Sequence, residues 1–137
     1  MEEWITKGTS MPTAKRILLV EDEDAILFAF KQVFKGNNAI VDTATTLAEA
    51  KALLDREVYA GVIADLRLTG ASNLDGLEVV KYARQVQESC KIVVATAYGG
   101  EETKATVMSL GADFYFEKPV SPRVVLEKLQ ILGAFQP

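Results

Sequence analysis

The sequence predicts an α/β fold in which five βα units wind around one parallel sheet. From Lys15 onward, short apolar runs alternate with longer segments of helical period, which is the pattern of successive βα units. The first, third and fourth runs are almost continuously hydrophobic, as is typical of strands that helices cover on both faces. With 137 residues, 49% of them hydrophobic, the chain has the size and composition of one globular domain.

Each expected strand opens one βα unit. The strands are 16–20, 39–44, 60–64, 91–96 and 113–117. In the segment after the first strand, Ile26, Phe30 and Phe34 recur at helical spacing and form one apolar stripe. The other intervening segments are expected to be helices that pack one face on the sheet.

Residues at the expected helix ends fit this assignment. Thr46 and Glu49 have capping-box spacing at the start of the second helix. Ser121 and Pro122 suit the cap and the first turn of the last helix. Glycines stand where helices should end, at Gly36, Gly111 and Gly133.

Composition argues against several classes of function. The net charge is −4 and no cluster of Lys and Arg interrupts the sequence, so we expect no direct contact with nucleic acid. One cysteine, no signal peptide and no long apolar run favour a soluble, cytoplasmic protein with no membrane contact. The absence of histidine excludes His-ligated metals, a His general base and a phosphohistidine on this chain. Residues 1–14 are expected to form a flexible tail before a domain at 15–137.

Residues that can carry chemistry follow the expected strands. In open parallel sheets, ligands bind beyond the carboxyl ends of the strands. The residues at those ends are Glu21 to Asp24, Asp65, Thr96 and Lys118. Taken singly, each has a plain structural role: Asp24 suits a helix N-cap, an isolated Asp a turn, a Thr a local hydrogen bond and a Lys a solvated charge.

Together these residues indicate a metal and phosphoryl site. Carboxylates gathered at one edge repel one another unless a cation lies among them. Oxygen ligands without His or Cys favour Mg²⁺. Beside such a metal, an ammonium and a hydroxyl can each bind an oxygen of a tetrahedral anion, which leaves one carboxylate as the attacking group.

Five motifs in one order resemble the receiver domain of two-component response regulators. They are ILLVEDE, VIADLRL, DGLEVV, VVATA and FYFEKPV. The resemblance runs from about Lys15 to Gly133. It implies a doubly wound, flavodoxin-like sheet with strand order 2-1-3-4-5.

The resemblance also implies a phosphoacceptor and a set of metal ligands. Asp65 would accept the phosphoryl group and form an acyl phosphate. Mg²⁺ would be bound by Asp65, Glu21 and Asp22, with Asp22 a direct ligand and Glu21 acting through water. The main-chain carbonyl of Arg67 would be a further ligand.

Two more residues would contact the phosphoryl group in a protein of this family. These are Thr96 and Lys118, and the bond from Lys118 to Pro119 would be cis. Thr96 would move toward a phosphoryl oxygen and leave space into which Tyr115 turns, so that Thr96 and Tyr115 form the switch.

The expected output surface comprises the helix at 101–111, the strand at 113–117 and the last helix. Alternation along the strand puts Phe114 and Phe116 on one face and Tyr115 on the other. The helix should supply side chains of mixed polarity, as at a transient interface, from Lys104, Val107 and Met108. The loop at 69–74 is the alternative output route.

The sequence departs from the family pattern in two places. Asp75-Gly76 comes ten residues after Asp65 where the family usually has seven, so the loop is longer by three. Because the insertion follows Arg67, the carbonyl that would bind the metal should stay in place. The first acid is Glu21 where the family more often has Asp.

Three function hypotheses follow. The first is a phosphorylation-operated switch, which receives its phosphoryl group from a separate histidine kinase or phosphotransfer protein and acts on a downstream protein or a fused output domain. It would be no enzyme beyond its own phosphorylation and dephosphorylation. The second is an aspartate-nucleophile phosphatase of the dehalogenase type, which requires a second acid where this chain has Arg67. The third is a phosphorylation-independent pseudo-receiver, against which the complete set of site residues argues.

Overall fold

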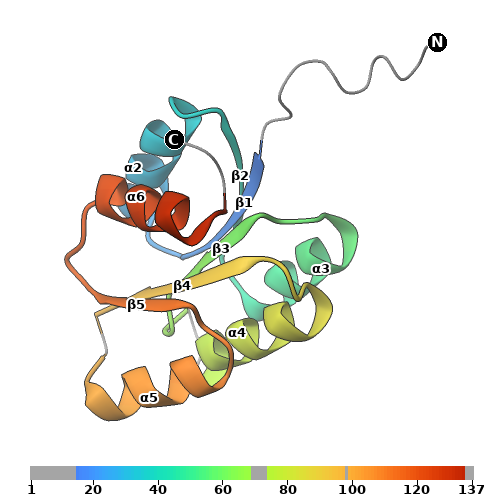
Figure 1. The fold of residues 1–137 in the computed structure, drawn as a ribbon, viewed down its shortest axis with the longest axis vertical. Helices are drawn as coiled ribbons and strands as arrows, with labels where there is room; N and C mark the ends of the chain where they lie inside the picture. The colour runs from blue at the N-terminus through green and yellow to red at the C-terminus, as the bar shows by residue number, and fades with distance from the viewer. Residues whose placement is uncertain (1–14, 69–73, 98, 135–137) are drawn as a thin grey trace.

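The computed structural model describes residues 15–68, 74–97 and 99–134. Within these ranges one sheet lies between two layers of helices (Figure 1). The elements in chain order are β1 (Lys15–Val20), α2 (Asp24–Lys35), β2 (Ala39–Ala44), α3 (Leu47–Arg56), β3 (Gly61–Ala64), α4 (Leu74–Val86), β4 (Lys91–Thr96), α5 (Glu101–Ser109), β5 (Phe114–Glu117) and α6 (Pro122–Leu132). The strands pair in parallel in the order β2-β1-β3-β4-β5, which confirms the predicted fold class and strand order. The expected tail, residues 1–14, lies outside the described residues.

The two faces of the sheet carry separate cores. Helices α2 and α6 cover one face, and α3, α4 and α5 cover the other (Figure 1). Along β1, Ile17 and Leu19 pack under α2 and α6, whereas Leu18 and Val20 pack under the other layer. Because successive side chains of a strand point to opposite faces, a strand covered on both sides must be apolar throughout. This requirement explains the continuous hydrophobic runs of the inner strands.

The register of β1 and β3 aligns the ends of these two strands. Val20 pairs with Ala64, so that the residues that follow, Glu21 and Asp65, leave the sheet at the same level. The Asp65 N–H donates a hydrogen bond of 3.0 Å to the Val20 carbonyl, which continues the ladder one residue beyond β3. The two acids are therefore placed by backbone pairing.

The ends of β4 and β5 are aligned in the same way. Thr96 pairs with Glu117, and the N–H of the following residue, Lys118, donates to the Thr96 carbonyl at 2.9 Å. The Lys118–Pro119 peptide bond is cis, as the family resemblance implied. The lysine thus leaves the sheet at the same edge as the acids.

Side chains cap two helices at the predicted places. The Thr46 hydroxyl accepts a hydrogen bond from the Glu49 N–H at 3.1 Å, and the Glu49 carboxylate accepts one from the Thr45 N–H at 2.7 Å. The reciprocal bond of this capping box therefore reaches one residue further back than expected. Ser121 caps α6 by accepting from the Val124 N–H at 3.2 Å.

The predicted cap of the first helix is wrong. Helix α2 begins at Asp24, its N-cap is Glu23, and no side chain there makes a cap hydrogen bond. The reason is that the Glu23 N–H donates to the Glu21 carboxylate at 3.1 Å, which fixes the chain one residue earlier. The Glu23 carbonyl then accepts from Leu27 at 3.0 Å and starts the helix.

Candidate metal centre

Three acids converge beyond the carboxyl ends of β1 and β3. Glu21 and Asp22 follow β1, Asp65 follows β3, and one carboxylate oxygen from each lies within 4.8 Å of the others. Glu21 is 3% exposed and Asp65 is 7% exposed, whereas Asp22 is half-buried. Burying carboxylates without a counter-ion costs several kcal/mol per ion. The cluster therefore requires a cation.

Lys118 supplies one positive charge to this cluster. Its Nζ lies 2.7 Å from Oε1 of Glu21 and 3.1 Å from Oδ2 of Asp65. Its side chain is 16% exposed, so both ion pairs are largely shielded from water. The lysine, which follows β5, thereby bridges two residues that follow β1 and β3.

The bridge shifts the pKa of both kinds of group. Burial raises the pKa of Glu21, and the hydrogen bond and charge of Lys118 offset only part of that rise. Burial lowers the pKa of Lys118, but the hydrogen bond and charge of Glu21, followed by Asp65, outweigh burial and raise it overall. The lysine therefore stays protonated at neutral pH and is the counter-ion of the buried acids.

Backbone N–H groups fix the orientation of both buried carboxylates. Asp65 accepts from the Arg67 N–H at Oδ1, 3.3 Å away, and from Lys118 at Oδ2. Glu21 accepts from the Glu23 N–H at Oε2, 3.1 Å away, and from Lys118 at Oε1. Each of these carboxylates thus has a partner at both oxygens, which holds it in one rotamer.

The donor set suits Mg²⁺. All side-chain ligands are oxygens, which is the preference of hard cations. Three carboxylates face one ammonium, so a divalent cation would balance the charge of the ionised cluster and a monovalent one would not. The residues that would bind it are Glu21, Asp22, Asp65 and, through its main-chain carbonyl, Arg67.

The two residues predicted to form the switch lie on neighbouring strands. Thr96 ends β4 and is fully buried. Tyr115, in the middle of β5, is 9% exposed, and its hydroxyl accepts a hydrogen bond from the Gly100 N–H at 3.1 Å. The Tyr115 ring packs in the core beneath α3, α4 and α5, whereas Phe114 and Phe116 pack on the opposite face, as the alternation predicts.

One residue expected on the output surface is buried. Val107 is 0% exposed and packs into the core beneath α5, so the prediction that it lines the surface is wrong. Lys104 and Met108, four residues apart and hence on one side of the helix, are exposed. The alternative output loop, 69–74, lies outside the described residues except for its last position, at which α4 begins.

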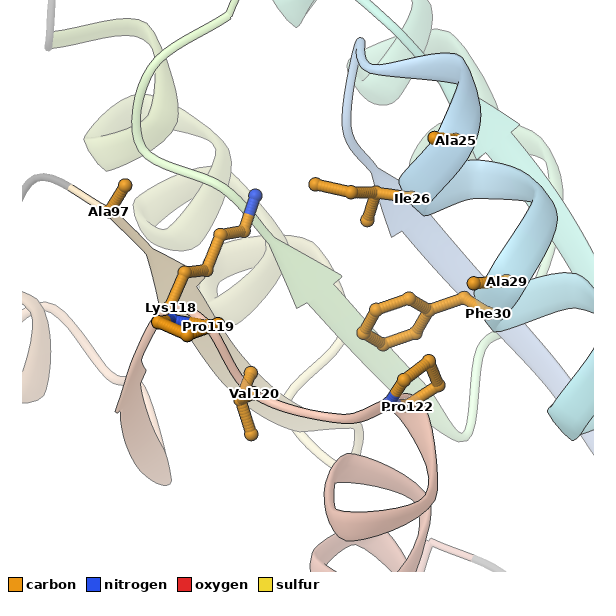
Figure 2. Close-up of a pocket in the computed structure, with 9 residues that line it drawn as sticks. All are labelled: Ala25, Ile26, Ala29, Phe30, Ala97, Lys118, Pro119, Val120 and Pro122. Atoms are coloured by element: carbon orange, nitrogen blue, oxygen red, sulfur yellow. The ribbon is translucent and has the colours of Figure 1, made fainter.

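An apolar groove adjoins the acid cluster, and the sequence did not reveal it. Figure 2 shows its lining residues, with the side chains of Ile26 and Lys118 pointing toward one another across the opening. The volume of the groove is about 480 Å³. It is lined by Ala25, Ile26, Ala29 and Phe30 of α2, by Ala97, and by Lys118, Pro119, Val120 and Pro122. The only indication of the groove in the sequence was a pair of small residues four apart on α2, Ala25 and Ala29. The other wall of the groove comes from the β5–α6 connection, which is distant in sequence.

The comparisons with known proteins agree with this geometry. The family model described as "Response regulator receiver domain" matches residues 17–130. The photosynthetic apparatus regulatory protein RegA of Cereibacter sphaeroides is 31% identical over 90% of this chain and 65% of its own length. The alginate biosynthesis transcriptional regulatory protein AlgB of Pseudomonas aeruginosa is 39% identical over 88% of this chain and 25% of its own length. The chain thus spans less than two thirds of either relative.

Two solved structures are similar over most of the chain. A CheY-like response regulator receiver domain protein from Methanospirillum hungatei has a TM-score of 0.79 and 32% identity, covering 86% of this chain and 92% of that one. A Burkholderia pseudomallei response regulator, solved with a phosphorylated aspartic acid, a calcium ion and citrate, has a TM-score of 0.78 and 26% identity. The match covers 85% of this chain and 66% of that one. In the described ranges, no helix combines the length and hydrophobicity needed to cross a bilayer.

Replacing Lys118 with methionine should destabilise the protein most in the absence of metal. We expect the free energy of unfolding in EDTA to fall by about 3 kcal/mol, because buried carboxylates lose their counter-ion. Mg²⁺ should add more stability to this variant than to the wild type, because no ammonium competes for the acids. Urea unfolding in EDTA and in Mg²⁺ measures both effects, with the exposed Lys81→Met as the matched control.

The destabilisation by Lys118→Met should also grow with pH. Without the lysine, the pKa of Glu21 rises further, because burial and the charge of Asp65 raise it and only the hydrogen bond from the Glu23 N–H still lowers it. A carboxyl whose pKa is higher in the folded than in the unfolded protein contributes stability that is lost as pH rises through the folded pKa. An equal loss of stability throughout the range from about pH 5 to 8 would contradict this account of the cluster.

Proposed function

The chain belongs to the response regulator receiver domain family, and we propose that it is a phosphorylation-operated switch of a two-component system. In this proposal a histidine kinase or a histidine phosphotransfer protein donates a phosphoryl group to Asp65 in a Mg²⁺-dependent step. The observation that carries the proposal is the position of Asp65, buried at the sheet edge between two further acids and the ammonium of Lys118.

The proposed reaction modifies only the chain's own aspartate. A carboxylate oxygen of Asp65 attacks phosphorus, the P–N bond of the donor's phosphohistidine breaks, and the imidazole leaves with the bond's electron pair and takes up a proton. Bound Mg²⁺ would supply positive charge to the phosphoryl oxygens. Lys118 already contacts Asp65 at 3.1 Å and would pair with a phosphoryl oxygen, and the Thr96 hydroxyl would donate to another. Water later cleaves the acyl phosphate and returns the switch to its first state.

The relatives support the phosphorylated aspartate and leave the output to be proposed. The Burkholderia pseudomallei regulator carries a phosphorylated aspartic acid on the same fold. RegA and AlgB are regulatory proteins of which the match covers 65% and 25%, and AlgB is named as transcriptional. We therefore propose that the signal passes to a downstream protein or a fused output domain, in the cytoplasm.

The pseudo-receiver hypothesis accounts less well for the site. A pure interaction module has no need of buried acids bridged by a lysine, because such a cluster is costly unless it binds something. The phosphatase hypothesis is disfavoured because Arg67 stands where a second acid is required, and its side chain is exposed.

Acetyl phosphate with Mg²⁺ should phosphorylate Asp65 without any protein donor. We expect intact-mass measurement to show one added phosphoryl group on the wild type and none on Asp65→Ala. The matched control is Asp24→Asn, which removes a nearby exposed carboxylate outside the cluster and should leave the modification intact. If the wild type gains no phosphoryl group and binds no beryllofluoride, the switch proposal fails and the pseudo-receiver hypothesis gains support.

We propose that the donor's helix docks in the apolar groove beside the cluster. The groove runs from α2 to the β5–α6 connection and ends at Lys118, which contacts Asp65, so a helix seated in it would bring a histidine to the acceptor (Figure 2). Amphipathic helices bind apolar grooves of this kind through side chains at helical spacing.

Ile26→Glu should therefore separate protein donors from small ones. For any histidine kinase in a purified panel that phosphorylates the wild type, we expect transfer to slow by about tenfold or more, because a charge must be buried at the interface. The acetyl phosphate rate should be unchanged. Phe28→Glu is the matched control, because Phe28 lies on the same helix, is 64% exposed and does not line the groove. Equal transfer rates for both variants would exclude the groove.

We propose that the output runs through Tyr115 and the surface of α5, β5 and α6. The Tyr115 hydroxyl occupies a space that exists because residue 99 is glycine: a Cβ on Gly99 would overlap the hydroxyl oxygen and lie 2.9 Å from Cζ. The inward position of the ring therefore depends on Gly99 and on the Gly100 N–H that donates to the hydroxyl.

Gly99→Ala should disconnect the output surface from the phosphoryl site. In the wild type, beryllofluoride should change amide chemical shifts around Asp65, at Tyr115 and throughout residues 101–110. In the variant, the shifts around Asp65 should still change, whereas those of α5 should not, because the Cβ of residue 99 would keep Tyr115 out of its inward position both with and without beryllofluoride. Gly36→Ala is the control, because a Cβ there meets no atom closer than 3.7 Å. A wild-type response that never reaches Tyr115 rejects this route in favour of the loop at 69–74.

A further inference from the structure

Gly76 contacts the backbone beside the phosphoacceptor. It is the third residue of α4, and its N–H donates a hydrogen bond of 3.1 Å to the carbonyl of Leu66, the residue after Asp65. The first N–H groups of a helix have no acceptor within the helix. Leu66 supplies one of these missing acceptors, so the loop after β3 and the start of α4 fix each other.

The contact is possible only with glycine. A Cβ on Gly76 would lie 2.5 Å from the Leu66 carbonyl carbon and still closer to its Cα and oxygen. These are backbone atoms, and they cannot withdraw, because the Leu66 side chain is 3% exposed and packed in the core. Glycine within a helix lowers helix stability by about 1 kcal/mol relative to alanine. The close contact between Gly76 and the Leu66 backbone offsets this loss.

The segment that Gly76 holds connects two of the proposed metal ligands. Leu66 lies between Asp65, whose carboxylate belongs to the acid cluster, and Arg67, whose carbonyl would bind the metal. On its other side the segment is held by the hydrogen bond from the Asp65 N–H to the Val20 carbonyl. The backbone from Asp65 to Arg67 is thus clamped between β1 and α4.

We propose that Gly76 is a positioning residue of the metal centre. By clamping Leu66 it holds the Asp65 carboxylate and the Arg67 carbonyl in the relative position that a divalent cation requires. This inference rests on the proposed function. It adds to that function a residue eleven positions from the phosphoacceptor in sequence, which acts only through the backbone.

The test compares Gly76→Ala with Gly36→Ala in Mg²⁺ titrations followed by calorimetry. For Gly76→Ala we expect the dissociation constant to rise by about tenfold, the usual effect of losing support to a metal ligand. Gly36→Ala should match the wild type. The Mg²⁺ concentration that gives half-maximal phosphorylation by acetyl phosphate should rise by the same factor, while the rate at saturating Mg²⁺ stays near the wild-type value. A purely structural role would lower the unfolding midpoint and leave the dissociation constant of the folded variant unchanged, which would overturn the inference.

A measurement on the wild type decides the case if Gly76→Ala does not fold. Mg²⁺ at saturation should slow hydrogen exchange of the Gly76 amide, because a bound ligand restrains the carbonyl that this amide contacts. The Gly36 amide, which donates to Gln32 on α2, should exchange at an unchanged rate. Unchanged exchange at Gly76 overturns the inference. Wild-type protein that binds no Mg²⁺ overturns the proposed function as well, whereas normal wild-type binding with no effect at Gly76 leaves that function standing.

Discussion

The bridge from Lys118 to Glu21 and Asp65 is the interaction on which the rest of the site depends. It joins residues separated by 97 and 53 positions in sequence, so it exists only when β1, β3 and β5 lie at one sheet edge. Removing a lysine and two carboxylates from water raises the free energy of the folded state. The hydrogen bonds offset this desolvation penalty, because every oxygen of the two acids has a partner. The same hydrogen bonds leave Asp65 with one orientation, which is what the proposed attack on phosphorus would need.

A second cation fixes the opposite end of the sheet. The guanidinium of Arg84, near the end of α4, donates to the carbonyl of Gly111 at 2.8 Å and to that of Cys90 at 2.9 Å. It also pairs with Asp113 at 2.8 Å, and the Asp113 carboxylate accepts from the Ile92 N–H. Strand β5 is therefore anchored at its start by Arg84 and at its end by Lys118. Tyr115 lies between these anchors, so in the proposed switch its side chain would rotate while both ends of β5 stay held.

The features that the sequence predicted correctly are those that depend on local residue patterns and on the parallel topology of the sheet. The continuous apolar runs gave the inner strands, and the caps at Thr46 and Ser121 gave two helix starts, because these signals act within a few residues. Asp24 was misassigned because the competing bond, from Glu23 to Glu21, depends on where β1 ends. Val107 was misplaced because α5 is short and weakly amphipathic, so its buried side is set by the sheet. The groove and the close contacts of Gly76 and Gly99 could not be predicted, since each depends on a partner from another part of the fold.

The late position of β5 in the chain gives the site a further property. When β1, β3 and β4 have paired, the acids and Thr96 are already in place, but the ammonium that neutralises the acids is still missing until β5 joins the edge of the sheet. A chain in which β5 has not joined the sheet therefore presents repelling carboxylates without the ammonium of Lys118. In the proposed switch, the ability of Asp65 to accept a phosphoryl group would thus be coupled to the pairing of β5 with the rest of the sheet.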